Sequence, residues 1–396
     1  MVRADSEVRV TSGWEAGLLL KPAVRARRDK TDPVDHARRF GQLRRRLNAA
    51  GVSGLLVTHL PDVRYLCGFT GSSAALAITR RAARLFTDGR YRTQAAEEVK
   101  GAKIEIVSGA PALGAVQWLS AQPGTETAGF DPSRTSVAEL ARWKAGLASG
   151  LRRKFLVSLE EPLLDTLRMV KDEDELVLMR EAALLGCRLF EHVLTFLHPG
   201  LREIDVAAEL EHQARILGAE GMSFETIAAS GPRSALPHGR ATIARLPRRG
   251  FLTLDFGVIL NGYCSDMTRT VHFGAPSPKE RTAYESVLEA QQAAVAAVAS
   301  GVTCGDVDEA ARSVLRRAGL ADAFSHSTGH GVGLEIHEPP RVGTGQTTRL
   351  FPGMVVTIEP GIYLQGEFGI RIEDMVTVTR TGCEVLTPSP KALIEI

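Results

Sequence analysis

The sequence has few cysteines, and their spacing suggests no pairing. The five are odd in number and widely separated, without a Cys-x-x-Cys pair: Cys67, Cys187, Cys264, Cys304 and Cys383. A disulfide framework and a zinc knuckle are both disfavoured, so a reducing compartment is expected. The sequence also lacks GxSxG and has no cysteine placed beside a partnered histidine, which argues against serine and cysteine hydrolases.

Long apolar runs and a large net charge are also missing. No run approaches the roughly 18 apolar residues of a membrane span, and the start is too charged for a signal peptide. We therefore expect a cytoplasmic protein without a membrane partner. The net charge of +2 argues against bulk binding to nucleic acid. Basic runs at 25–28 and 38–46 could bind phosphate, but the second run reads as a helix with Phe40, Leu43 and Leu47 inward, so its arginines are expected to face solvent.

What is present is a two-part organisation, as 396 residues favour. Residues 1–33 lack clear periodicity and read as an N-terminal extension. Residues 34–165 mix strand and helix patterns, which predicts an α/β domain, and the charged run 171–175 marks its junction with a second domain at 166–396. In the first domain we expect strands near 54–58, 74–79, 83–87, 103–107 and 154–159 and helices at about 35–50 and 134–147.

The second part contains an internal repeat. PGLREIDVAAELEHQARILG, from Pro199, is echoed by SGVTCGDVDEAARSVLRRAG, from Ser300. Each copy follows a long helical pattern, at about 173–196 and 278–299, and precedes a β-rich segment. The repeat predicts a duplicated domain.

The first β-rich segment, FLTLDFGVILNGYCSDMTRTVHF (251–273), reads as a hairpin around Asn261-Gly262. With these two residues as the turn, Asp266 faces Gly257 on the other strand. Because residues i and i+2 share a face, Asp255 and Asp266 are then diagonal neighbours, about 7–8 Å apart or less. A slip of one residue would send one aspartate to the opposite face.

The second β-rich segment, 353–379, repeats this arrangement with glutamates. Glu359 shares a face with Thr357, and Glu373 shares a face with Arg371 on the returning strand. A pseudo-twofold arrangement would bring both glutamates to the two aspartates. Four buried carboxylates repel one another and take up protons unless cations neutralise them. With one imidazole they predict two divalent ions, and such an oxygen-rich site suits Mn, Co, Fe or Zn.

The stretch FSHSTGHGVGLEIH (324–337) contributes three histidines, His326, His330 and His337. A His pair at i, i+4 can be the zinc-binding face of a helix. However, three glycines lie among them, and each costs a helix interior about 1 kcal/mol. A loop and strand passing close to the site is therefore expected.

In order, spacing and context these acids and His330 resemble the pita-bread metallopeptidases, which include methionine aminopeptidase, aminopeptidase P and Xaa-Pro dipeptidase. The phrases LDFG, GYCSDMTRT, GHGVGLEIHE, TIEPGIY and GIRIEDMV resemble the Xaa-Pro-specific branch, and VRYLCGFTGSSAAL and LFTDGRY resemble the creatinase N-terminal domain. The expected fold class is α/β (α+β). A creatinase-like (ribonuclease H-like) domain at 34–165 would precede a pseudo-twofold pita-bread catalytic domain at 166–396.

The resemblance also implies roles for single residues. Glu359 would be a ligand that shuttles a proton between the bridging water and the leaving amine. His238 and His337 would contact the substrate near the reacting centre, and Arg371 would orient the site and also bind the substrate. His326 would lie in the active site beyond the ligands, on the substrate side. The implied metal ligands are Asp255, Asp266, His330, Glu359 and Glu373.

The implied activity is hydrolysis of the peptide bond before proline at a free N-terminus, with a metal-bridging hydroxide as nucleophile. The resemblance further implies two divalent ions per chain, manganese first with cobalt, zinc or iron as alternatives, and a homodimer. Xaa-Pro dipeptidase and aminopeptidase P both remain open. A metal-free creatinase-like hydrolase and a non-enzymatic pita-bread binding protein are the alternatives, and members of both kinds lack part of the ligand set.

Overall fold

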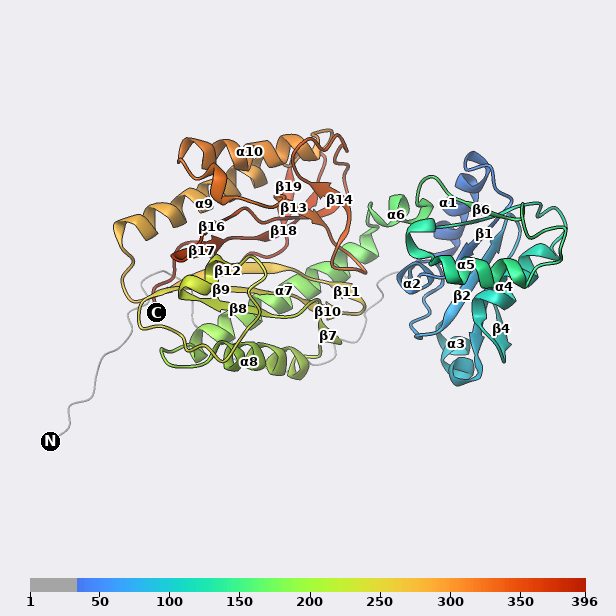
Figure 1. Cartoon of the computed structure of the whole chain (residues 1–396), viewed down its shortest axis with the longest axis horizontal. Coiled ribbons are helices and arrows are strands. Elements are labelled where there is room, and N and C mark those ends of the chain that lie inside the picture. The colour runs from blue at the N-terminus through green and yellow to red at the C-terminus, as the bar shows by residue number, and fades with distance from the viewer. Residues whose placement is uncertain (1–33) are drawn as a thin grey trace.

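The computed structural model describes residues 34–396, which form two bodies (Figure 1). Helix α6 (Leu163–Arg168) lies between them. The extension expected at 1–33, with its basic run 25–28, falls outside the described residues. The active-site residues expected from the sequence all belong to the C-terminal body.

The N-terminal body is one six-stranded sheet flanked by helices, in the order β4-β3-β2-β1-β5-β6. The strands expected from the sequence form, and the short strand β5 is an addition to them. The strands are β1 (Gly54–Val57), β2 (Ala74–Thr79), β3 (Ala83–Asp88), β4 (Lys103–Val107), β5 (Ala128–Phe130) and β6 (Leu156–Ser158). The helices are α1 (His36–Ala49), α2 (Leu60–Cys67), α3 (Arg92–Glu98), α4 (Pro111–Ser120) and α5 (Val137–Ala145).

Helix α1 corrects one expectation. Its apolar face is buried as predicted, but its arginines do not all face solvent: Arg39 is only 3% exposed. The Arg39 guanidinium donates to the Tyr65 carbonyl oxygen at 2.8 Å and to Asp172 Oδ2 at 2.8 Å. Asp172 begins the first long helix of the C-terminal body, so this buried cation joins the two bodies.

The C-terminal body repeats one arrangement twice. In the first half α7 (Glu173–Phe196) and α8 (Glu203–Ile216) pack with the sheet β12-β9-β8, and in the second α9 (Pro278–Ala297) and α10 (Cys304–Arg317) pack with the sheet β14-β13-β15-β18-β19. Figure 1 shows the two helix pairs on opposite sides of the strands.

The strands of this body are short, and most are buried. Those of the first half are β7 (Gly221–Met222), β8 (Ile227–Ser230), β9 (Gly250–Phe256), β10 (Val258–Leu260), β11 (Tyr263–Cys264) and β12 (Met267–Phe273). Those of the second half are β13 (Gly329–Gly331), β14 (Glu338–Val342), β15 (Val355–Ile358), β16 (Gly361–Leu364), β17 (Phe368–Arg371), β18 (Asp374–Val378) and β19 (Cys383–Val385).

The repeated Asp-Val pair of the sequence opens the equivalent helices α8 and α10. Asp205 and Asp306 each accept a hydrogen bond from the backbone N–H of the residue before their helix, at 2.9 and 3.3 Å. Val206 and Val307 are fully buried. The repeat therefore has a physical reason, because the acid caps the helix and the valine fills the core beneath it.

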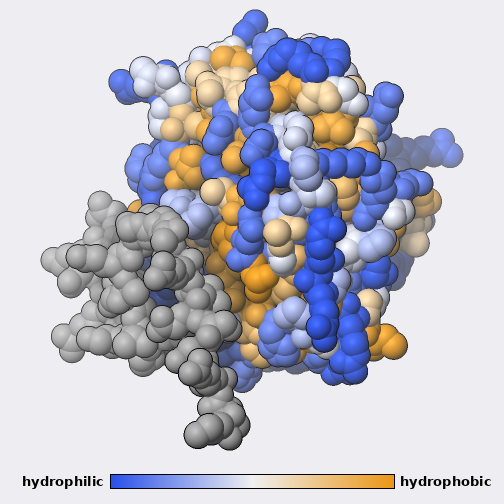
Figure 2. Space-filling model, turned by 90° about the vertical axis from the view of Figure 1, so that its left-hand side faces the viewer, coloured by the Kyte–Doolittle hydropathy of each residue, from blue (hydrophilic) through white to orange (hydrophobic). Residues whose placement is uncertain are grey.

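Within residues 34–396 no helix has the length and apolar character to cross a membrane. The face of the C-terminal body in Figure 2 carries many hydrophilic side chains, with smaller hydrophobic areas between them.

Candidate metal centre

The first hairpin places its two aspartates as predicted. Leu260 pairs with Tyr263 across the turn, and in the same register Asp255 pairs with Thr268. Asp266 lies between β11 and β12, diagonal to Asp255, and both aspartates are buried, at 4% and 9% exposed. The hairpin register expected from the sequence is confirmed.

The second hairpin presents its glutamates in a different way. Ile358 pairs with Asp374 and, further along, Gly361 pairs with Arg371. The unbroken register between these pairs sets Glu359 opposite Glu373. The two glutamates therefore face each other directly, whereas the aspartates are diagonal.

His330 reaches the centre from β13, which lies between β14 and β15. A Cβ at Gly329 or Gly331 would lie 1.9 or 2.2 Å from a carbonyl oxygen of a neighbouring segment, so only glycine fits beside the histidine. The stretch is a strand followed by a loop, as its glycines predicted. His330 Nε2 lies 3.5 Å from Asp266 Oδ2 and 3.5 Å from Glu359 Oε1.

Three of the predicted ligands form the tightest group. One ligand atom from each of Asp266, His330 and Glu373 lies within 4.8 Å of the others. Asp255 is close by but turns Oδ2 toward Arg371, which donates to it at 2.6 Å. The Asp255 carboxylate is therefore shared between the centre and a buried guanidinium.

Each hairpin also holds a side chain of the other. Thr268, on the first hairpin, donates from Oγ1 to Glu373 Oε2 at 2.7 Å. Arg371, on the second, donates to Thr268 Oγ1 at 3.1 Å as well as to Asp255. The arrangement of the carboxylates thus depends on contact between the two halves.

Burial and mutual repulsion raise the pKa of three carboxyl groups of the centre, those of Asp266, Glu373 and Glu359. Burial first, and then the charges of Glu373 and Asp255, raise the pKa of Asp266 well above its ordinary value. Burial, followed by the charge of Glu359, does the same to the pKa of Glu373. Burial is also the main cause that raises the pKa of Glu359 to about 8. Without cations these groups are driven to hold protons.

The imidazole is prepared to be a ligand. Burial lowers the pKa of His330 to about 4, so the ring is neutral. Its Nδ1–H donates to the Gly331 carbonyl oxygen at 2.9 Å, which leaves the Nε2 lone pair directed at two carboxylates. A lone pair facing carboxylate oxygens is unfavourable unless a proton or a metal cation lies between them.

Two carboxylate oxygens also lack a partner. Asp255 Oδ1 and Glu373 Oε1 are buried without a hydrogen bond from any described residue. Buried polar atoms without partners are costly and point to an ion or water. The donor set, the neutral imidazole and these two oxygens together fit divalent metal ions.

Comparison with known proteins places this geometry in a family. Residues 177–380 match metallopeptidase family M24, and residues 39–170 match the creatinase/prolidase N-terminal domain. The chain belongs to metallopeptidase family M24. Divalent metal ions are implied by this membership and agree with the side chains just described.

Individual relatives of this M24 chain cover nearly all of it. It is 40% identical to the uncharacterized peptidase YqhT of Bacillus subtilis over 90% of this chain and 97% of that protein. The Xaa-Pro dipeptidase from Bacillus anthracis superposes with a TM-score of 0.87 at 38% identity, covering 91% of this chain and all of that one. The X-Pro aminopeptidase from Thermotoga maritima gives 0.81 at 34% identity, covering 89% and 100%.

The M24 chain keeps three further histidines close to the centre, at different depths. The His337 ring lies 4.5 Å from the His330 ring and is open to solvent on its other side. Partial burial, followed by the charge of His238, lowers the pKa of His337. His326 lies deeper, and burial lowers its pKa to about 4. His238 and His337 are thus the accessible members of the group.

Tyr363 is a residue of the site that sequence reasoning missed. It receives a hydrogen bond from Arg371 at 2.6 Å and bonds to His326 Nε2 at 2.8 Å. It therefore links His326 through Arg371 to Asp255. Tyr363 ends the phrase TIEPGIY, four residues after Glu359, and Thr268, also missed, stands two residues after Asp266, so the period-2 pattern of the strands could have marked both.

Proposed function

We propose that the chain is an Xaa-Pro peptidase that hydrolyses the bond before proline at a free N-terminus. The observation that carries the metal-dependent part of the proposal is the His330 imidazole, whose lone pair faces buried carboxylates. Support also comes from the relatives, since two similar solved structures are named an Xaa-Pro dipeptidase and an X-Pro aminopeptidase.

Two divalent cations per chain are part of this proposal, with manganese first and cobalt, zinc or iron as alternatives. When bound, they would supply a hydroxide nucleophile near neutral pH and polarise the scissile carbonyl. The residues proposed to hold them are Asp255, Asp266, His330, Glu359 and Glu373. A metal-free creatinase-like hydrolase or a binding protein would not need this complete set.

The surrounding side chains would divide the remaining work. Glu359, as a carboxylate beside the attacking water, is suited to carry a proton from that water to the leaving amine. His238 and His337 would donate hydrogen bonds to the substrate, where charge develops at the carbonyl. Arg371 would orient Asp255, and His326 would contact the substrate while Tyr363 connects it to Arg371.

A bond to proline calls for a dedicated enzyme. Its nitrogen carries no hydrogen, so a protease that reads backbone N–H groups recognises it poorly.

We further propose a homodimer in the cytoplasm; the five free cysteines are consistent with a reducing compartment.

The test is cleavage of Ala-Pro, Gly-Pro and Ala-Pro-Ala by metal-free protein with and without added Mn²⁺ or Co²⁺. We expect metal-dependent release of proline or alanine, and little cleavage of the control dipeptide Ala-Ala. Cleavage of the dipeptides alone would indicate a dipeptidase, and release of alanine from Ala-Pro-Ala would indicate an aminopeptidase. If no Xaa-Pro peptide is cleaved with either metal, the proposal is wrong.

A further inference from the structure

A buried ion network lies directly behind His337. Glu338, the next residue, is 7% exposed and accepts hydrogen bonds from Arg168 and from Lys171 Nζ, the latter at 2.8 Å. Arg168 and Lys171 are themselves buried, at 2% and 5% exposed, and both belong to the segment that joins the two bodies. A single carboxylate next to a histidine of the site thus meets two buried cations.

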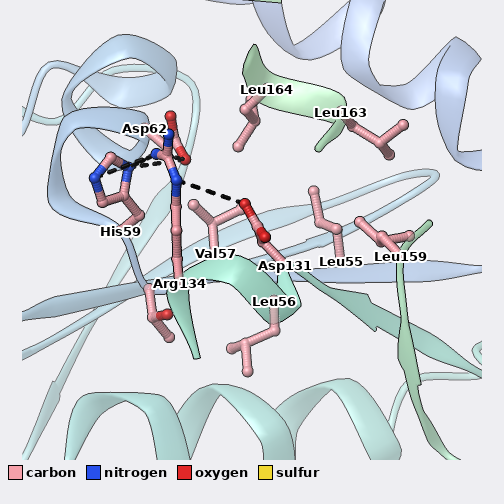
Figure 3. Close-up of a pocket in the computed structure, with 11 residues that line it drawn as sticks. Leu55, Leu56, Val57, His59, Asp62, Asp131, Arg134, Leu159, Leu163 and Leu164 are labelled. Carbon is pink, nitrogen blue, oxygen red and sulfur yellow. Dashed lines mark hydrogen bonds and ion pairs between the residues drawn. The ribbon is translucent and has the colours of Figure 1, made fainter. Parts of the chain in front are cut away.

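The network continues into the N-terminal body. Arg168 donates to Asp62 Oδ1 at 2.7 Å on one side and to Glu335 Oε2 at 2.7 Å on the other. His59 Nε2 lies 3.0 Å from Glu335 Oε1. Figure 3 shows His59, Asp62 and Arg134 pointing toward one another at this junction. Helix α2 is therefore linked by charge to the segment that carries His337.

The cavity beside His59, Asp62 and Arg134 has no room for a substrate. The cavity lined by His59, Asp62, Arg134 and their apolar neighbours has a volume of about 20 Å³. Such a space holds about one water molecule. The charges around it therefore serve contacts within the protein.

The loop 333–338 is wrapped around the Glu338 carboxylate. The Glu335 backbone N–H donates to Glu338 Oε1 at 3.1 Å. A Cβ at Gly333 would lie 2.7 Å from both Glu338 carboxylate oxygens, so the chain passes very close to them. The Gly333 carbonyl oxygen also accepts from the Cys264 N–H at 2.7 Å, on the first hairpin. His337 projects from this loop to within 4.5 Å of the His330 ring.

We propose that Glu338 and Glu335 are positioning residues for His337, and that the N-terminal body acts on the reaction within one chain by holding loop 333–338 through Arg168. This inference rests on the proposed function, in which His337 contacts the substrate. A displacement of about 1 Å in such a group can cost up to about 100-fold in rate.

A double-mutant cycle tests the proposal. In the otherwise unchanged protein, Glu338→Gln should lower kcat/KM for Ala-Pro about tenfold with metal content unchanged. In a His337→Ala background the same change should lower it less than about twofold, because the group being positioned is gone. Equal losses in both backgrounds, or loss of metal, would overturn the proposal. If Glu338→Gln does not fold, the partly exposed Glu335→Gln takes its place, with an expected loss of about threefold in the first background only.

Asp172→Asn is the matched control, because it weakens the Arg39 contact between the same two bodies while asparagine still caps α7. It should leave kcat/KM within about twofold. Hydrogen exchange of 333–338 is a readout independent of activity: it should quicken in Glu338→Gln and not in Asp172→Asn. If the wild-type protein cleaves no Xaa-Pro peptide, the proposed function fails, while unchanged exchange in Glu338→Gln would separately overturn the holding of the loop.

Discussion

The two halves of the C-terminal body share a backbone plan but serve the centre unequally. Sheet β12-β9-β8 of the first half corresponds to β18-β15-β13 of the second. Strand β13 carries His330, whereas the equivalent strand β8 carries no predicted ligand. Each of these two strands leads into a segment with a histidine proposed to face substrate, His238 in one half and His337 in the other. Duplication has therefore supplied the scaffold, and later differences have made the centre asymmetric.

The acids show the same inequality. The first half offers Asp255 and Asp266 diagonally, and the second offers the longer Glu359 and Glu373 face to face. The cluster of Asp266, His330 and Glu373 draws on both halves. Side-chain length and register, more than the backbone symmetry, decide which oxygens reach the centre.

Each half has a buried acid that binds the two ends of a loop. In the first half this acid is Glu203, at the start of α8. This fully buried carboxylate accepts hydrogen bonds from the hydroxyl groups of Ser230 at 3.0 Å and Thr242 at 2.8 Å, and from both backbone N–H groups. Ser230 and Thr242 are the two ends of the segment that contains His238. Glu203 therefore closes that segment into a loop.

The residue with this role in the second half is Asp308 on α10, which is also buried but lies about one turn further along its helix than Glu203 does. It accepts from the Thr328 hydroxyl at 2.7 Å and the Thr344 hydroxyl at 2.9 Å. The segment between them contains both His330 and His337. Asp308 thus supports a proposed ligand, whereas Glu203 supports only a residue that faces substrate.

The largest expected effect comes from breaking the cluster that draws on both halves. Asp266→Ala should lose at least one metal ion per chain, measured by elemental analysis, because Asp266 is central to the tightest group of donors. Loss of several kcal/mol of metal-supplied stabilisation predicts a fall in Ala-Pro hydrolysis of about a thousandfold or more. Asp322→Ala, at an exposed acid, is the control. Full metal content in Asp266→Ala would contradict the proposed ligand set.

A smaller effect is expected where one half holds a side chain of the other. Thr268→Val keeps the shape but removes the hydroxyl that donates to Glu373 and accepts from Arg371. Partners of ligands are typically worth about 10–100-fold in metal affinity, so metal titration should show a loss in that range. Thr253→Val, on the neighbouring strand, removes only a hydroxyl contact with Thr270 and should bind metal normally. If Thr268→Val and Thr253→Val bound metal with equal affinity, the hydrogen bonds of Thr268 with Glu373 and Arg371 would not contribute to metal binding.

The two loop-closing acids allow the asymmetry itself to be measured. Asp308→Asn should weaken metal binding about tenfold, because its loop carries His330. Glu203→Gln should leave metal affinity within about twofold and instead raise KM for Ala-Pro about threefold, because its loop carries only His238. The pair of variants controls for burial, since both acids are buried to a similar degree. If the two variants changed metal affinity and KM by the same factors, the two acids would have only a structural role.

Features encoded by neighbouring residues could be predicted from the sequence. The Asn261-Gly262 turn set the hairpin register, since both residues take the positive φ, 50° and 82°, that such a turn requires. Glycines around His330 excluded a helix because of their cost there. The element boundaries follow equally local signals, such as the acids that open α8 and α10.

Features made by distant segments could not be predicted in this way. Tyr363 joins His326 to Arg371 only once the loop before β13 and the second hairpin meet. The helical pattern of α1 showed that Arg39 borders an apolar face, but not that the other body supplies Asp172. The contact of Arg168 with Glu338 likewise joins residues that are 170 positions apart in the sequence.

The smallest expected effect concerns Glu335, because its contacts connect the N-terminal body to the loop that carries His337. Although burial alone would raise it, His59 and Arg168 lower the pKa of Glu335 to about 2. A carboxyl group whose pKa is lowered by folding stabilises the fold at pH values above its unfolded pKa of about 4.3. This stabilisation is lost as the pH falls toward 2. Between about pH 5 and pH 3, the unfolding free energy of the wild type should therefore fall more than that of Glu335→Gln, by less than about 1 kcal/mol for this partly exposed group.

Urea titration at the two pH values would measure this difference. The exposed-site control Glu97→Gln should follow the wild type across the same range. If Glu335→Gln also followed the wild type, the contact of Glu335 with His59 and Arg168 would contribute nothing to joining the bodies. In that case the His337 loop would be held only by the buried Glu338, and the two halves would be more alike than their contacts indicate.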